Sequence, residues 1–187
     1  MYSYIELYRY QLLHSTLIKW LINFTDLGHY LAKQLSFTSR YICMEQGFSI
    51  LILVVDDEPP VIDILRRLGQ DIFPQARFIS TDSPQQTLDY LDDTDKQQPQ
   101  LILLDIDFHQ SLNGIDLLPQ IRTRLRQQAP VIMFTMSDAQ PDIEQAYAAG
   151  AVAYTKKPDD LEGWKHYISV LKAYWYTTSR LPGYSES

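Results

Sequence analysis

The chain has few of the residues that build disulfides, histidine-rich metal sites or membrane spans. Its 187 residues include one cysteine, Cys43, which excludes an internal disulfide and fits a reducing cytosol. The four histidines show no ligand spacing among themselves. No apolar run reaches the length of about 18 residues typical of a membrane helix. The nearest, 12–24, is interrupted by His14 and Lys19 and lacks a signal-peptide cleavage site. We therefore expect a cytoplasmic protein without membrane contact.

Positive charge is also scarce in most of the chain. The formal net charge is −7, and residues 1–47 carry four basic and three acidic residues, so the remainder carries −8. Nucleic-acid surfaces need clustered Lys and Arg, so an acidic body of this kind argues against direct DNA binding.

The hydrophobic pattern changes near residue 47 and predicts two parts. Within 1–47, apolar side chains recur at spacings of three, four or seven, which predicts an amphipathic N-terminal helical extension. A loosely docked helix and a native product that begins at Met44 are both open interpretations. Residues 48–180 form the main predicted domain, and 181–187 form a tail.

The main domain alternates strand-like apolar runs with helical periodicity. The apolar runs occupy 49–55, 76–80, 101–104, 131–135 and 153–156. Helical patterns occupy 59–68, the stretch opened by Ser83-Pro84, 115–128, 142–149 and 161–178, with Gly69 and Gly150 expected to end two of them. This alternation predicts an α/β fold, a doubly wound parallel sheet of five strands with helices on both faces.

Polar side chains follow four of these strands where each strand ends. Asp56-Asp57-Glu58 follows the first strand and Asp105-Ile106-Asp107 follows the third. Thr135 ends the fourth strand, and Lys156-Lys157-Pro158 ends the fifth. Because the carboxyl ends of parallel strands share one edge of the sheet, we expect these side chains to meet in one pocket.

The residue types in this pocket are those that phosphoryl transfer needs. Asp56, Asp57 and Asp105 would repel one another unless a cation lay between them. Hard carboxylate oxygens without Cys or His suit Mg²⁺, which also neutralises an arriving phosphoryl group. Lys157 would provide a cation for a phosphate oxygen, and Thr135 a hydrogen-bond donor. Positioning and charge stabilisation of this kind account for most catalysis of phosphoryl transfer.

These motifs resemble the signature of bacterial response-regulator receiver domains, the CheY-like family. The intervals are 48 residues from Asp57 to Asp105, 30 on to Thr135 and 22 on to Lys157, and they are similar to those of the family. The resemblance covers roughly residues 48–178 and implies a flavodoxin-like sheet with the strand order 2-1-3-4-5.

The resemblance also implies the roles of the acidic residues. Asp105 would be the phosphoacceptor, and Asp57 would be a direct magnesium ligand together with Asp105. Asp56 would act mainly through bound water, and the backbone carbonyl of Asp107 would complete the ligands from the protein.

For the other site residues, the resemblance implies phosphoryl binding and switching. Lys157 would neutralise the phosphoryl group and Thr135 would hold it. Thr135 and Tyr154 would form the switch pair, in which Tyr154 turns inward behind Thr135. The peptide bond between Lys157 and Pro158 would be cis.

The loop after Asp105 departs from the family pattern. It reads DIDFHQSLNG, lacks the usual Met-Pro and is about one residue longer. We hypothesise that Asp107 and Ser137 tune the lifetime of the phosphoryl group, because both should face attacking water.

The resemblance implies a single-domain response regulator of a two-component system, phosphorylated by a sensor histidine kinase and signalling by protein contact rather than by enzymatic turnover. Only 29 residues follow Pro158, too few for a DNA-binding output domain. The ending, with Tyr174-Trp175, Thr178 and Leu181-Pro182, is similar to single-domain regulators paired with bacterial phytochromes. That similarity suggests a phytochrome-like kinase and a homodimer formed through the last helices and fifth strand. Aromatic residues at the end of the domain could form this interface or pack on their own sheet: Tyr167, Tyr174, Trp175 and Tyr176.

Three other functions use much of the same chemistry. A phosphorelay intermediate would pass the phosphoryl group to a histidine phosphotransfer protein. A phosphatase of the haloacid dehalogenase type would use the Asp-x-Asp of Asp105 and Asp107, but that family places this motif before its late acidic pair, whereas here the pair comes first. A constitutive docking module would bind its partner whether or not Asp105 is phosphorylated.

Overall fold

The computed structural model describes residues 49–108, 112–125, 129–179 and 181. The chain divides into two units, and all of these residues belong to the second, Ser49–Ser187. The helical extension predicted for 1–47 and the middle of the loop after Asp105 therefore lie outside the described residues. Within the described part, no helix is long and apolar enough to cross a membrane.

Five strands form one sheet, with bounds within one residue of the predicted ranges. They are β1 (Ile50–Val55), β2 (Ala76–Thr81), β3 (Leu101–Leu104), β4 (Val131–Thr135) and β5 (Ala153–Lys156). All neighbours are parallel, and the order is β2-β1-β3-β4-β5, which confirms the predicted doubly wound sheet. Every residue of β1, β3 and β4 is buried, because helices cover both faces of the sheet.

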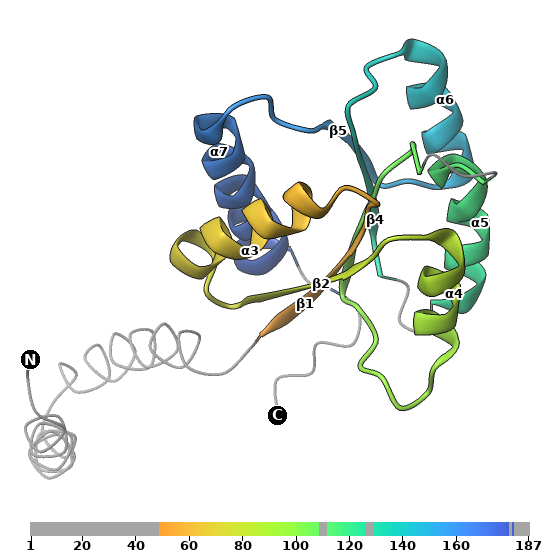
Figure 1. The fold of residues 1–187 in the computed structure, drawn as a ribbon, viewed down its shortest axis with the longest axis horizontal. Coiled ribbons are helices and arrows are strands. Elements are labelled where there is room, and N and C mark those ends of the chain that lie inside the picture. Colours follow the sequence, from red (N-terminus) through yellow and green to blue (C-terminus); the bar gives the residue numbers. More distant parts are fainter. Residues whose placement is uncertain (1–48, 109–111, 126–128, 180, 182–187) are drawn as a thin grey trace, which may run out of the picture. The chain divides into compact units, whose positions relative to one another are not determined.

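Five helices alternate with the strands, as the sequence predicts. They are α3 (Pro59–Ile72), α4 (Pro84–Asp92), α5 (Gly114–Arg124), α6 (Gln140–Ala149) and α7 (Leu161–Leu171). The helices α3 and α7 cover one face of the sheet, and α4, α5 and α6 cover the other (Figure 1). Ser83 caps α4 by accepting the Gln86 N–H, and Gly150 ends α6 with a φ of 103°, as expected for these residues.

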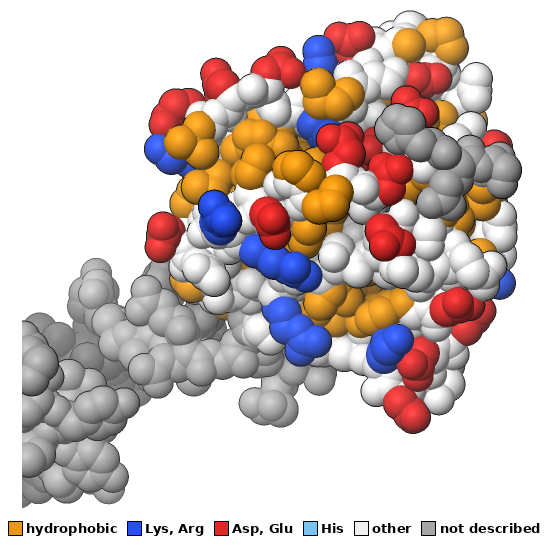
Figure 2. Space-filling view, in the orientation of Figure 1, with side chains coloured by type: hydrophobic (Ala, Val, Ile, Leu, Met, Phe, Trp, Pro, Cys, Tyr) orange, Lys and Arg blue, Asp and Glu red, His pale blue; other side chains and the backbone are white. Residues whose placement is uncertain are grey.

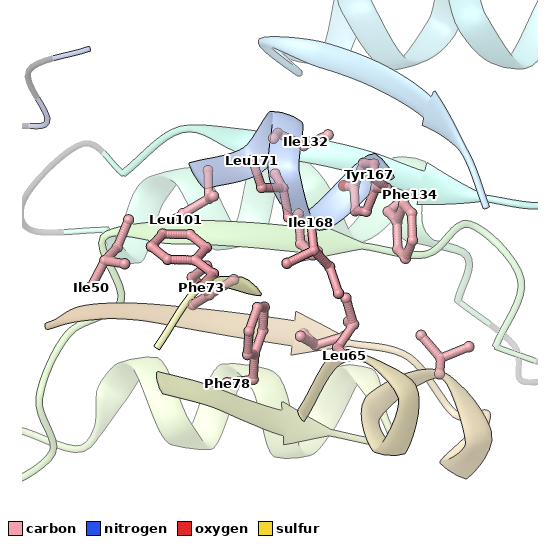
Figure 3. Packing of buried hydrophobic residues seen from close by; sticks show 14 of the residues in the cluster. Ile50, Leu65, Phe73, Phe78, Leu101, Ile132, Phe134, Tyr167, Ile168 and Leu171 are labelled. Atoms are coloured by element: carbon pink, nitrogen blue, oxygen red, sulfur yellow. The ribbon is translucent and has the colours of Figure 1, made fainter. Parts of the chain in front are cut away.

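The core between the sheet and the α3–α7 pair combines aliphatic side chains with several aromatic ones (Figure 3). Phe134 of β4 stacks on Tyr167 of α7 with ring centroids 4.6 Å apart, and it meets Trp164 edge-on at 5.6 Å. Because Tyr167 is buried in this core, it packs on its own sheet and is not available to a dimer interface. Contacts of this kind hold α7 against the strand that ends at Thr135.

The prediction that Gly69 ends the first helix is wrong, because α3 continues through it to Ile72. A Cβ atom at Gly69 would lie 2.7 Å from Cε2 of Phe78, a residue of β2. The glycine is therefore explained by the close approach of helix and strand, and not by a helix terminus.

The last predicted helix, 161–178, changes its geometry partway. The α-helix ends at Leu171, and a π-helical segment, η1 (Lys172–Thr178), follows it. Trp175 and Tyr176 both pack against the core, while Tyr174 is 54 % exposed. Of the aromatic residues suggested for a dimer interface, Tyr174 is thus the exposed one.

Candidate functional site

The predicted acidic residues converge where β1 and β3 end. The side chains of Asp56, Asp57 and Asp105 offer carboxylate oxygens that all lie within 4.8 Å of one another. Asp56 and Asp105 are buried, at 7 % and 3 % exposure, and Asp57 is half-buried. Figure 2 shows Asp and Glu side chains over much of the visible face, including the part that lies over this end of the sheet.

Lys157 enters the same pocket from the end of β5. Its Nζ lies 2.7 Å from Asp105 Oδ2 and 2.9 Å from Asp56 Oδ2, and the residue is 2 % exposed. The backbone N–H of Lys157 donates to the Thr135 carbonyl at 2.7 Å, which fixes the start of the side chain against β4. The structure thus brings together Asp105, the acidic pair and the lysine, as the sequence predicts.

The charges in this pocket are strongly coupled. Burial raises the pKa of Asp56 to about 6, although the Lys157 ammonium and the Glu58 N–H favour its charged form. Burial also disfavours a charged Lys157, but the hydrogen bond to Asp105 and the charge of Asp56 outweigh this effect and raise the lysine pKa. One ammonium therefore faces three carboxylates. The negative charge that remains in the pocket favours the binding of a further cation.

Glu58 is a member of the site whose contact the sequence did not indicate. Its backbone N–H donates to Asp56 Oδ1 at 2.9 Å, and its Oε1 lies 3.2 Å from Lys157 Nζ. The Glu58 carboxylate is half-exposed, so solvent weakens this ion pair relative to the two buried ones. Glu58 also precedes α3, which places the acidic loop at a helix N-terminus.

The predicted switch residues, Thr135 and Tyr154, meet at the loop after β4. Thr135 is 2 % exposed at the end of β4, and its Oγ1 accepts the N–H of Ser137 at 3.4 Å. The Tyr154 hydroxyl, on β5, donates to the carbonyl of Ser137 at 3.1 Å. Burial raises the pKa of Tyr154, so it stays a neutral donor at physiological pH. Both predicted residues therefore contact Ser137, which the sequence suggested for a different role.

The backbone that carries Asp105 is packed against Gly114. A Cβ atom at Gly114 would lie 1.8 Å from the Asp105 carbonyl oxygen, and the Gly114 N–H donates to the Ile106 carbonyl at 2.8 Å. The Ile106 N–H in turn donates to Asp105 Oδ1 at 2.7 Å. Only glycine allows this approach of the start of α5 to the backbone of Asp105.

Replacing Gly114 with alanine is expected to displace the backbone around Asp105. The added Cβ would meet the Asp105 carbonyl and Ile106 Cα, which are backbone atoms, so the main chain would have to shift. We expect a loss of about 1–3 kcal/mol in the free energy of unfolding. Urea denaturation would measure it. Gly163→Ala is the control, because its nearest contact is a Pro158 side-chain atom at 3.0 Å. Equal stability of the two variants would show that the Gly114 contact imposes no constraint.

Two predictions concern residues beside the pocket. The Lys157–Pro158 peptide is trans, and there is no cis peptide in the described part of the chain, so the predicted cis bond is wrong. A trans peptide is favoured before proline by about 0.5–1 kcal/mol, and Lys157 already reaches Asp105 and Asp56 with this geometry. Asp107 is exposed just beyond Asp105, and the role of its carbonyl as a metal ligand stays a prediction.

Comparison with known families identifies the class of protein. The response regulator receiver domain model matches residues 52–168, more than half of the chain. The chain therefore belongs to the response regulator receiver domain family of two-component systems. This membership favours a receiver over a phosphatase of the haloacid dehalogenase type.

Several known proteins are similar to this chain in sequence or in fold. The probable methanogenesis regulatory protein FilR2 of Methanothrix harundinacea (strain 6Ac) is 28 % identical over 144 residues, covering 75 % of this chain and 92 % of FilR2. The phosphorylated cyanobacterial phytochrome response regulator RcpA superposes with a TM-score of 0.65 at 21 % identity, covering 72 % of this chain and 99 % of RcpA. Response regulator RPA3017, in red light signaling of R. palustris, gives 0.63 at 26 % identity, covering 72 % of this chain and 99 % of RPA3017.

Proposed function

We propose that this chain is a single-domain response regulator in which Asp105 accepts a phosphoryl group from a sensor histidine kinase. One observation carries the proposal: the carboxylates of Asp56, Asp57 and Asp105 lie within 4.8 Å of one another, with Lys157 Nζ 2.7 Å from Asp105. A buried carboxylate beside a buried ammonium, at the open end of a parallel sheet, is a suitable acceptor for a phosphoryl group.

The donor set fits Mg²⁺. Its side-chain atoms are carboxylate oxygens, and their charge exceeds that of Lys157. The ion would be held by Asp57 and Asp105 directly, by Asp56 mainly through water and by the backbone carbonyl of Asp107. When bound, Mg²⁺ neutralises negative charge on phosphoryl oxygens.

Different residues of the chain would then carry out different parts of the reaction. A carboxylate oxygen of Asp105 attacks the phosphorus of a phosphohistidine, so that a P–O bond forms and the P–N bond breaks. The electron pair of the P–N bond leaves with the imidazole, which takes a proton from water. Lys157 neutralises charge on the transferring group, and the Thr135 hydroxyl donates to a phosphoryl oxygen. Thr135 and Tyr154 then shift the population of a second conformation of the surface around α6, β5 and α7.

The proposal assigns no turnover activity toward other substrates, and only the phosphorylation and dephosphorylation of Asp105 itself. The chain would be cytoplasmic, and its partners would be a sensor histidine kinase and a downstream protein that reads the switched surface. The likeness to RPA3017, a response regulator in red light signaling, supports a kinase that responds to red light, and the similarity of the chain's ending to phytochrome-paired regulators suggests a phytochrome-like one. Phosphotransfer from a purified phytochrome kinase, compared with a non-phytochrome kinase, would test that choice.

Incubation with acetyl phosphate and Mg²⁺ is the direct test of the phosphoacceptor. Intact-mass spectrometry should show one added phosphoryl group per chain, and peptide mapping should place it on Asp105. A second group elsewhere, or none, would contradict the proposed function.

Removal of divalent ions is expected to abolish this labelling. Without a cation, the excess carboxylate charge repels the anionic donor, so EDTA should reduce the initial rate to background. In the same samples, Mg²⁺ at about 100 times its Kd should stabilise the fold by about 2.7 kcal/mol, seen as a higher Tm. Asp57→Asn should weaken both effects. Labelling that proceeds unchanged in EDTA would remove Mg²⁺ from the proposal.

A further inference from the structure

Ser137 hydrogen-bonds in three directions at the mouth of the site. Its N–H donates to Thr135 Oγ1 at 3.4 Å, and its carbonyl accepts the Tyr154 hydroxyl at 3.1 Å. Its own hydroxyl donates to Asp142 Oδ2 at 2.5 Å and accepts the N–H of Ala139 at 3.3 Å. One residue thus connects β4, β5 and the first turn of α6.

The Asp142 carboxylate fixes this arrangement. Asp142 forms no ion pair within the described part of the chain, so its charge is used in a charge-assisted bond to the Ser137 hydroxyl. Helix α6 begins at Gln140, and its N-cap residue, Ala139, provides no side-chain cap. Capping of α6 alone would explain the bonds of the Ser137 hydroxyl. It would not require the Ser137 backbone to contact both Thr135 and Tyr154.

We propose that Asp142 is a positioning residue for phosphorylation of Asp105, acting through Ser137. The inference rests on the proposed function and adds a residue to it. Because Thr135 Oγ1 accepts the Ser137 N–H, its own proton is free to donate toward the phosphoryl group. The bond between Ser137 and Asp142 therefore fixes the direction of the Thr135 hydroxyl. Through the Ser137 carbonyl, the same bond fixes the position of the Tyr154 hydroxyl.

Asp142→Ala is the first test, with the initial rate of labelling by acetyl phosphate as the readout. Loss of the anchoring bond should lower this rate about 5-fold, since such a change corresponds to roughly one hydrogen bond. The Mg²⁺ concentration that gives half the maximal rate should not change, because Asp142 does not touch the acidic residues. Asp142→Asn should restore most of the rate, because its amide oxygen still accepts from Ser137.

The matched control is Asp138→Ala, which removes the same charge four residues earlier, in the loop that leads into α6. Asp138 is exposed and pairs with Lys156 at 3.2 Å, and among the described residues its carboxylate forms no hydrogen bond with Ser137. This variant should be labelled at the wild-type rate. An equal loss of rate in both variants would mean that charge alone matters, and would overturn the inference.

A double-mutant cycle separates positioning from folding. Ser137→Ala and Asp142→Ala should lower the rate to similar extents, and the double variant should be no slower than either. Additive losses would overturn the inference, as would a normal rate in Asp142→Ala. Thermal unfolding confirms that each variant is folded at the assay temperature, and the Asn variant serves if the Ala variant is not. An unlabelled wild-type chain would instead refute the proposed function itself.

Discussion

Replacing Asp105 with asparagine is expected to abolish phosphorylation of the chain. The amide lacks the carboxylate oxygen that attacks phosphorus, so acetyl phosphate and Mg²⁺ should give no mass increase over the time that saturates the wild type. The Asn side-chain oxygen can still accept the Ile106 N–H that Asp105 Oδ1 accepts at 2.7 Å. Lys157 keeps Asp56 as a partner at 2.9 Å. The variant should therefore remain folded, so the loss reports on chemistry.

Asp107→Asn is the control for this experiment. It makes the same chemical change two positions along the chain, on an exposed side chain. Labelling should persist in this variant, and its dephosphorylation rate tests whether Asp107 tunes the lifetime of the phosphoryl group. If Asp105→Asn were labelled as fast as the wild type, the acceptor would be a different residue.

Replacing Lys157 with methionine is expected to damage both stability and phosphorylation. Nζ of Lys157 contacts Asp105 and Asp56, and all three side chains are 3 % exposed or less. Breaking a buried pair by removal of one partner costs about 3–5 kcal/mol, because the remaining charges are buried without compensation. Labelling should slow about 100-fold or more, as when a group that stabilises the transition state is lost. Urea denaturation and the labelling rate measure the two effects.

Lys156→Met gives a matched comparison one residue away. Lys156 is exposed and pairs with Asp138, also exposed, so its loss should change stability by less than about 1 kcal/mol. Saturating Mg²⁺ should raise the stability of Lys157→Met more than that of the wild type, since the ion replaces part of the missing positive charge. Equal stability of the two lysine variants would show that the buried ion pairs contribute little.

The strands and the site could be predicted from the sequence for a common reason. Buried parallel strands are continuous apolar runs, and the first charged or hydroxyl residue marks where each run leaves the core, as at Asp56, Asp105 and Thr135. The same residues therefore define the end of the strand and the site. The shared edge of a parallel sheet then brings them together without further information.

The features that the sequence did not indicate depend on contacts between distant residues. Gly69 has the sequence pattern of a helix-ending glycine. The structure explains the glycine differently, because a Cβ at this position would lie 2.7 Å from the Phe78 ring. The Glu58 contact with Lys157 joins residues 99 positions apart, and depends on how far two long side chains reach. Gly114 is required because the Asp105 carbonyl oxygen lies where a Cβ would be, and the hydrophobic periodicity of the sequence does not indicate this contact.

The place of Lys157 has a consequence for how the sheet comes apart. Lys157 directly follows β5, a strand at the margin of the sheet that pairs with β4 alone. Its ammonium reaches past β4 to the residues that follow β3 and β1. These ion pairs thus connect β5, at the margin of the sheet, to the residues that follow the central strands β1 and β3. The rate at which β5 amides exchange with deuterium should therefore follow the charge at Asp105, so that the margin of the sheet reports on the chemistry at its centre.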